Sequence, residues 1–270
     1  MKKVKHLFLG FSFLILSASV FAQEVENTGI EEIIVTARQQ AESLQDVPVT
    51  VSVMSEVDLD RYNITSLTDA AKMVPNFRIN AGGSGNGSNI YLRGIGSSSI
   101  SAAFDQSVAI NIDGVVVNRG RFIHNAYLDM SQIEVLKGPQ SLYFGKSATA
   151  GVISIKTNDP TDQFEAEFGV GVETEHETTF FEGVISGPIS DNFLARLAFG
   201  TSETDELREN YSFGNDPMPY GNGTKPYFGE ESTNARLTLL WTPTETLTAK
   251  LKYQYSKYEN DGGGTMYQEE

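Results

Sequence analysis

Few residues in this chain could do chemistry, and their spacing does not support catalysis. The 270 residues include no cysteine, which excludes a thiolate nucleophile, a thiolate metal site and a disulfide framework. Beyond residue 22 there are two histidines, His124 and His176, and neither belongs to an H-x-x-x-H or H-E-x-x-H pattern. The glycine-rich run 82–88 has neither the spacing of a nucleophile elbow nor the Lys-Ser/Thr pair of a phosphate-binding loop. The sequence therefore predicts a protein that is not an enzyme, with no catalytic residue, no metal site and no cofactor.

The balance of charge narrows the possible partners. The formal net charge at pH 7 is −15, whereas a protein that binds phosphate groups needs a basic surface. We therefore expect no nucleic-acid partner. With catalysis and nucleic-acid binding excluded, the polar side chains are left with a role in binding another partner. Such a role depends on the strands and loops that position them.

Five stretches after Asn158 alternate apolar and polar residues for about ten positions each, with charged residues on one face only. The apolar face consists of Phe164, Ala166, Phe168, Val170 and Val172, then Thr179, Phe181, Gly183 and Ile185, then Phe193, Ala195, Leu197 and Phe199, then Ala235, Leu237, Leu239 and Trp241, and finally Leu247, Ala249, Leu251, Tyr253 and Tyr255. The charges opposite them are Glu165, Glu167, Glu173, Glu182, Arg196, Arg236, Lys250 and Lys252. Strands of about 9–11 residues with one apolar face are typical of a transmembrane β-barrel.

The connections between these stretches favour the same structure. Short connections at 187–192 and 242–246 alternate with a long polar one at 202–231, and aromatic residues gather near the strand ends. Bacterial outer-membrane barrels have short periplasmic turns, long outer loops and aromatic girdles. A soluble β-sandwich also has alternating strands and remains the alternative.

The N-terminus has the three parts of a secretory signal peptide. Lys2, Lys3 and Lys5 precede an apolar run at 7–16, and the small-residue site Val20-Phe21-Ala22 follows. We therefore expect residues 1–22 to be removed between Ala22 and Gln23. The apolar run is too short to cross a bilayer as a helix. An exported protein with barrel strands is expected in the outer membrane of a Gram-negative cell.

Residues 44–157 predict a compact α+β domain between these two regions. Its predicted strands cover 49–53, 90–93, 108–112, 115–117, 133–136 and 152–156, and its predicted helices cover 56–61 and 67–72. Only the linker 158–163 separates this domain from the first barrel stretch. On so short a tether the domain must lie just under a barrel or inside it. A barrel of about 22 strands has a plugged lumen, so we expect the domain to be its stopper.

Several motifs resemble the plug domain of TonB-dependent outer-membrane receptors. Residues 133–140 read I-E-V-L-K-G-P-Q, and the matching residues after them are Gly145, Lys146, Ala148, Gly151, Ile153, Ile155 and Thr157. Residues 89–97 and 109–114 resemble internal plug motifs in the expected order. The segment that resembles the TonB box consists of Glu31, Glu32, Ile33, Ile34, Val35, Thr36 and Ala37. Departures from the family pattern are mild: Lys137 and Lys146 replace the usual arginines, and Ala150 replaces a glycine.

The resemblance implies a fold and a mechanism. The fold is an α+β plug followed by an antiparallel transmembrane β-barrel of about 22 strands. About five strands are present at 164–270, so we expect the N-terminal part of a longer receptor. Residues 23–43 form a periplasmic segment that carries the TonB box at 31–37. TonB, energised by the inner-membrane ExbB/ExbD complex, pulls the plug to import a scarce large ligand. A ferric siderophore is the default ligand, with carbohydrate, cobalamin or another metal chelate as alternatives.

The resemblance also assigns site residues. Arg93 and Lys137 would latch the plug to acidic residues of the barrel, although ordinary solvated charges explain them equally well. The outward plug loops at 82–89, 97–106 and 118–125 hold the residues that would face an anionic aromatic chelate. These are Phe104, Arg119, Arg121, Phe122 and His124, and solvated loop side chains are the commoner explanation.

The TonB box has its own alternative. Ile33, Ile34 and Val35 form a short β-prone run with polar flanks and no hydrophobic neighbour to pack on, so we expect an exposed segment that can add as a strand to a partner's sheet. The alternative is a first strand of the plug. Two other protein classes also stay open: a secretion or adhesion barrel gated by its N-terminal domain, and, least favoured, an outer-membrane enzyme.

Overall fold

The computed structural model describes residues 33–36, 40, 42–64, 66–80, 88–97, 105–117, 128–174, 177–204 and 229–260. All described helices and strands fall in Ile34–Glu270, one of the two units into which the chain divides. The expected signal peptide and its cleavage point at Ala22 and Gln23 lie outside the described residues. In the described part of the chain, no helix is long and apolar enough to cross a membrane.

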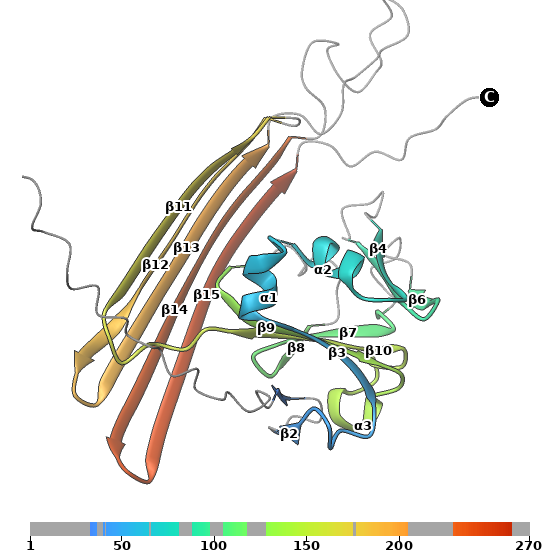
Figure 1. The fold of residues 1–270 in the computed structure, drawn as a ribbon, viewed down its shortest axis with the longest axis horizontal. Coiled ribbons are helices and arrows are strands. Elements are labelled where there is room, and N and C mark those ends of the chain that lie inside the picture. The colour runs from blue at the N-terminus through green and yellow to red at the C-terminus, as the bar shows by residue number, and fades with distance from the viewer. Residues whose placement is uncertain are drawn as a thin grey trace, which may run out of the picture. The chain divides into compact units, whose positions relative to one another are not determined.

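A five-stranded sheet forms the centre of the α+β domain (Figure 1). Its strands are, in spatial order, β3 (Thr50–Ser55), β9 (Met130–Lys137), β10 (Gly151–Thr157), β7 (Val108–Ile112) and β8 (Val115–Val117). β7 and β10 run parallel and the other neighbours are antiparallel. Both faces of β9 and β10 are buried: one face contributes Ile133 and Ile153 to a first core, and the other contributes Leu136 and Val152 to a second. Strands buried on both faces carry apolar residues on both, and polar residues such as Glu134 and Ser154 interrupt the apolar residues of these two strands.

Two capped helices and a small sheet complete this domain. α1 (Glu56–Arg61) begins at Ser55 with a capping box to Asp58, and α2 (Leu67–Met73) begins at the cap Ser66. Serine at these positions satisfies main-chain N–H groups that the first turn leaves without partners. The predicted helix 56–61 is confirmed, and the second predicted helix ends one residue later than expected. The small sheet consists of β4 (Phe77–Asn80), β5 (Asn89–Leu92) and β6 (Ile95–Ser97), and α3 is Ser141–Phe144.

Two tight turns depend on left-handed backbone. Arg93 and Gly94 join β5 to β6 with φ of 52° and 80°, and Asp113 and Gly114 join β7 to β8 with φ of 48° and 91°. Positive φ at both central residues suits the right-handed twist of the flanking strands. The predicted turn at Asp113-Gly114 is therefore confirmed, whereas the same chemistry at Arg93-Gly94 was overlooked in the sequence.

The second large sheet, called the wall, contains five antiparallel strands in chain order. They are β11 (Glu165–Glu173), β12 (Thr178–Ser190), β13 (Phe193–Thr204), β14 (Glu230–Thr244) and β15 (Leu247–Asn260). Most strands are longer than the predicted ten residues, and the turn after β12 is only Asp191 and Asn192. The predicted connection 187–192 is therefore short, as expected, but it begins at Asp191 because the strand pairing continues to Ser190. The connection after β13 is long, as predicted.

The two faces of the wall differ as the alternation predicts. Phe168, Val170 and Leu251 on the apolar face are 62%, 81% and 61% exposed, whereas Arg236 on the polar face is 2% exposed. On the apolar face the Phe199 ring lies 5.6 Å from that of Phe181 and 6.3 Å from that of Phe168. An open row of exposed aromatic and aliphatic side chains is what a lipid-facing surface requires.

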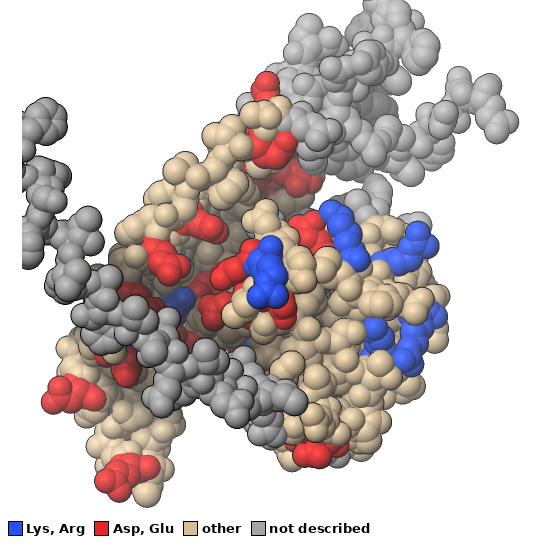
Figure 2. Space-filling model, viewed as in Figure 1, with Lys and Arg blue, Asp and Glu red and all other residues tan. Residues whose placement is uncertain are grey.

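Charge is distributed unevenly over the described surface. In Figure 2, basic side chains gather around α2 and the β4–β6 sheet, while acidic side chains spread along the wall and its turns. The polar face of the wall is the exception, because Arg196, Arg236, Lys250 and Lys252 all point from β13, β14 and β15 toward the α+β domain.

Candidate functional site

The N-terminal segment is docked on the α+β domain. β1 (Ile34–Val35) pairs antiparallel with β2 (Glu42–Ser43). Ile34 is 41% exposed, but Val35 is fully buried in the second core with Leu136 and Val152. The expectation of an isolated segment without apolar neighbours is therefore wrong for Val35, and the alternative of a first strand describes these residues better. The sequence could not show that the second face of β9 and β10 supplies those neighbours. Glu31, Glu32 and Ala37 lie outside the described residues.

A buried carboxylate holds the end of this segment. The main-chain N–H of Thr36 donates to Oε1 and Oε2 of Glu134 at 2.9 and 3.0 Å, and the Thr36 hydroxyl donates to Oε1 at 3.0 Å. Gln132, two residues earlier on β9, donates from Nε2 to the Ile34 carbonyl at 3.1 Å. Glu134 is 1% exposed. Burial raises the pKa of Glu134, against the opposing effect of the hydrogen bonds from Thr36 and the charge of Lys156.

Sequence reasoning missed Gln132 and Glu134 as partners of this segment. The signal was present, since Glu134 is a charged residue inside the apolar run of β9. A buried carboxylate needs hydrogen-bond donors, but nothing in the sequence identified a donor 98 residues away.

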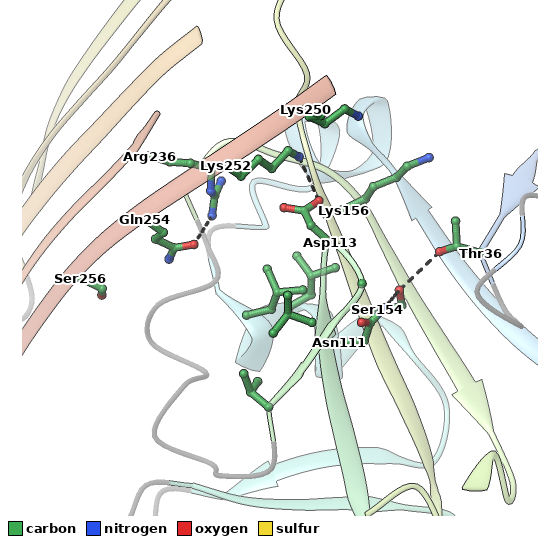
Figure 3. Close-up of a pocket in the computed structure, with 15 residues that line it drawn as sticks. Thr36, Asn111, Asp113, Ser154, Lys156, Arg236, Lys250, Lys252, Gln254 and Ser256 are labelled. Atoms are coloured by element: carbon green, nitrogen blue, oxygen red, sulfur yellow. Dashed lines mark hydrogen bonds and ion pairs between the residues drawn. The ribbon is translucent and has the colours of Figure 1, made fainter. Parts of the chain in front are cut away.

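A cavity of about 900 Å³ lies between the α+β domain and the wall. Thr36, Asn111 and Ser154 line one side, and wall residues including Arg236, Lys250 and Lys252 line the other (Figure 3). Asn111 donates to Ser154 Oγ at 3.1 Å, and Ser154 Oγ lies 3.5 Å from Thr36 Oγ1. The buried Oδ1 of Asn111 has no hydrogen-bond partner among the described residues. Asp113 also lines the cavity and is paired with Lys252, so the charges on its two sides partly compensate each other.

The domain is fixed to the wall by ion pairs in which the wall supplies the cations. The Arg196 guanidinium donates from Nε to Asp129 Oδ2 at 2.8 Å and from Nη2 to Oδ1 at 2.6 Å. The Asp129 side chain is only 3% exposed. Arg236 donates to the carbonyl of Leu128, the residue before Asp129.

A second group of contacts surrounds the exit of β10. Lys252 lies 3.1 Å from Asp113 and donates to Thr157 Oγ1 at 2.7 Å. Lys250 pairs with Asp159 at 2.5 Å. Both groups of contacts thus lie where the chain leaves the domain to enter the wall.

The predicted latch residues lie elsewhere. Arg93 is in the β5–β6 turn and Lys137 is at the end of β9. The two residues are close enough for the charge of Arg93 to act on the Lys137 ammonium group. Burial, and then the Arg93 charge, lower the pKa of Lys137. Within the described residues neither side chain makes an ion pair, so the wall strands β11–β15 do not supply their acidic partners. Their latch role stays a prediction. The predicted ligand-facing residues Phe104, Arg119, Arg121, Phe122 and His124 lie outside the described residues.

Comparison with known proteins agrees with this architecture. Residues 43–152 match the family model described as the TonB-dependent Receptor Plug Domain. The chain is 29% identical over 219 residues to the iron-regulated outer membrane virulence protein of Vibrio cholerae, which covers 76% of the chain and 32% of that protein. It is 29% identical over 198 residues to the vitamin B12 transporter BtuB of Vibrio vulnificus, covering 70% of the chain and 30% of that protein. The chain thus spans about a third of the length of these relatives.

Solved structures of receptors share the fold. The ferric yersiniabactin uptake receptor FyuA from Yersinia pestis matches with a TM-score of 0.64 and 24% identity, over 78% of this chain and 31% of that one. The pyoverdine outer membrane receptor FpvA from Pseudomonas aeruginosa matches with a TM-score of 0.67 and 14% identity, over 87% and 31%. A domain docked on a lipid-type wall, the matching family model and these folds lead to one conclusion: residues 43–152 form a TonB-dependent receptor plug domain, and the wall that follows has the fold of the first barrel strands of such receptors.

Proposed function

We propose that this chain is part of an importer that moves a scarce, large ligand across the outer membrane, with TonB displacing the plug. The observation that carries the proposal is the plug itself, tied to a lipid-type wall by the short linker 158–163 and by buried contacts such as Arg196 with Asp129. A domain in that place obstructs the lumen, so a ligand passes only when the domain moves. Strand addition of residues 31–37 to TonB would deliver the force, with ExbB/ExbD as its source in the inner membrane.

A ferric siderophore is the proposed ligand. The Vibrio cholerae relative is named as iron-regulated, and FyuA is named as a ferric yersiniabactin uptake receptor. Cobalamin is the second candidate, because the identity to the vitamin B12 transporter is also 29%. Carbohydrate and other metal chelates have no observation in their favour.

An uptake assay separates these ligands. Cells that make the receptor, with and without TonB, would be given radiolabelled iron as a set of ferric siderophores and, separately, labelled cyanocobalamin. The proposal expects TonB-dependent accumulation of iron from at least one siderophore and no accumulation of cyanocobalamin. Uptake of cyanocobalamin alone would favour the second candidate. Uptake that does not require TonB would contradict an energised importer and favour a secretion or adhesion barrel.

Localisation follows the same proposal. We expect the mature protein in the outer membrane after cleavage between Ala22 and Gln23. N-terminal sequencing of the receptor from purified outer membranes checks both points, because an uncleaved chain would begin at Met1.

A further inference from the structure

Residues 34–36 have the shape of a strand, yet both of its edges are already occupied. The Ile34 carbonyl accepts from Gln132 Nε2, and the Thr36 N–H donates to the Glu134 carboxylate. In a strand, main-chain groups of residues i and i+2 point to the same edge, so these two contacts lie on one side. β2 pairs with β1 antiparallel, with Val35 opposite Glu42, and this leaves β2 the opposite edge. No edge of the segment remains free for another strand.

The side chains of Gln132 and Glu134 supply the donor and the acceptor that the main chain of a neighbouring strand would otherwise supply. They are two residues apart on β9, so their side chains leave the same face of the sheet. Their spacing is about 6.6 Å, which is also the repeat between alternate residues of a facing strand. The Gln132 amide supplies the donor for a carbonyl, and the Glu134 carboxylate supplies the acceptor for an N–H. The Thr36 hydroxyl adds one further hydrogen bond to the same carboxylate.

The contact with Glu134 is the stronger of the two. Hydrogen bonds to a charged acceptor are shorter and stronger than neutral ones, and this acceptor is 1% exposed. Among the described residues, all three hydrogen bonds to the carboxylate come from Thr36. Lys156 on β10 is the charged neighbour that acts on it. The segment and the carboxylate therefore depend on each other for partners.

We propose that Gln132 and Glu134 form a catch that holds residues 34–36 on β9 and withholds their main-chain groups from any partner strand. The inference rests on the proposed function, in which TonB pairs with this segment, and it adds the residues that control the pairing. The segment leaves β9 before a partner's sheet edge can add to it. Thr36 also lines the cavity beside Ser154, so its departure changes the cavity wall at that point.

A single thiol can report release of the catch. The 270 residues contain no cysteine, and Val35 is fully buried. In the receptor carrying Val35→Cys, maleimide labelling in outer-membrane vesicles should be slow. Adding Glu134→Gln should raise the labelling rate about tenfold, the factor expected when a charge-assisted hydrogen bond is lost. Adding Gln132→Ala should raise it by a smaller factor, because the hydrogen bond from Gln132 to the Ile34 carbonyl is neutral. Glu167→Gln, an exposed wall carboxylate with the same chemical change, should leave the rate unaltered.

Two outcomes of this experiment overturn the catch. One is unchanged labelling in both Gln132→Ala and Glu134→Gln. The other is an equal rise in Glu167→Gln, which would indicate general loosening. Gln132→Ala keeps the test valid if Glu134→Gln does not fold, because the Gln132 side chain is only partly buried. Heat-modifiable migration of the barrel checks folding in each variant.

A binding measurement separates failure of the catch from failure of the proposed function. The purified periplasmic domain of TonB should bind the Glu134→Gln receptor about tenfold more tightly than the natural receptor. If this domain binds all variants equally and labelling does not change, the catch is wrong and TonB coupling stands. If labelling rises but the domain binds no variant, including the natural receptor, the catch stands and TonB coupling is wrong.

Discussion

Individual ion pairs hold the plug, and the burial of each pair determines how much it contributes to the stability of the plug. Asp129 and Arg196 are 3% and 10% exposed, whereas Asp105 and Lys146 form a pair with 46% and 79% exposure. Both pairs have short distances, but exposed pairs gain little because water screens them and side-chain entropy opposes them. Breaking a buried pair leaves one charge without compensation, which is costly. The buried pair is therefore the one that anchors the plug.

Asp129→Asn should destabilise the plug by about 3 kcal/mol, because Arg196 loses its carboxylate in a buried site. Asp105→Asn makes the same chemical change at the exposed pair and should cost less than about 0.5 kcal/mol. Urea unfolding of the detergent-solubilised receptor, followed by hydrogen exchange of plug amides, measures both. Equal effects of the two substitutions would mean that the contact at Asp129 does not anchor the plug.

At the scale of elements, a helix cap stabilises α1 and an apolar face characterises the wall strands, and both features can be tested. α1 depends on its cap: the Ser55 hydroxyl donates to Asp58 Oδ2 at 2.8 Å and the Ser55 N–H donates to it at 3.1 Å. These bonds lower the pKa of Asp58 from its ordinary 3.8. The wall strands instead expose an apolar face of the kind that lipid covers, including Phe168 and Leu251.

Ser55→Ala should destabilise α1 by about 1 kcal/mol near neutral pH. Because the pKa of Asp58 is lowered in the folded state, its contribution is fully present above pH 3.8 and is lost as the pH falls through the folded pKa. The difference between Ser55→Ala and the natural protein should therefore shrink at acid pH. Hydrogen exchange of the α1 amides across that range measures it. A difference that stays constant with pH would exclude a role for the carboxylate.

Phe168→Arg should impair insertion of the receptor, because a charge at a lipid-facing midplane position costs about 2–4 kcal/mol. The neighbouring Glu167→Arg places the same side chain on the polar face and should insert normally. The amount of heat-modifiable protein in outer membranes compares them. If both insert equally well, the assignment of β11 to a lipid-facing wall is wrong.

At the scale of the whole molecule, the proposed function requires force to travel from the N-terminal segment into the plug. The plug sheet has the order β3-β9-β10-β7-β8, so β3, its first strand in the chain, is at one edge. The wall contacts at Asp113 and Thr157 hold the other half of the sheet. An edge strand can leave a sheet without breaking the pairs between the remaining strands. We therefore expect the half that contains β3 to move first.

Ile34→Pro should abolish uptake by the receptor and leave binding of ligand at the cell surface intact. Proline removes a main-chain donor and restricts φ, which a strand-adding segment does not tolerate. Ile34→Val keeps the main-chain groups and should have little effect. Surface binding and accumulation of labelled ligand are measured on the same cells. Binding and uptake that fall together would indicate plug misfolding, and normal uptake would exclude residues 31–37 as the TonB box.

The sequence by itself determined most of the elements and the family of the plug domain. Alternation after Asn158 set which residues of the wall face outward, and the Ser55 and Ser66 caps and the Asp113-Gly114 turn marked helix and hairpin positions, because these features depend on neighbours within a few residues. Three features were not predictable in this way. They are the burial of Val35, the hydrogen bonds between Thr36 and Glu134, and the ion pair between Asp129 and Arg196. Their partners are separated by 98 residues in one case and 67 in another. Only the tertiary structure decided them, since a buried carboxylate or guanidinium accepts whichever complementary group the packing of distant strands brings within hydrogen-bonding distance.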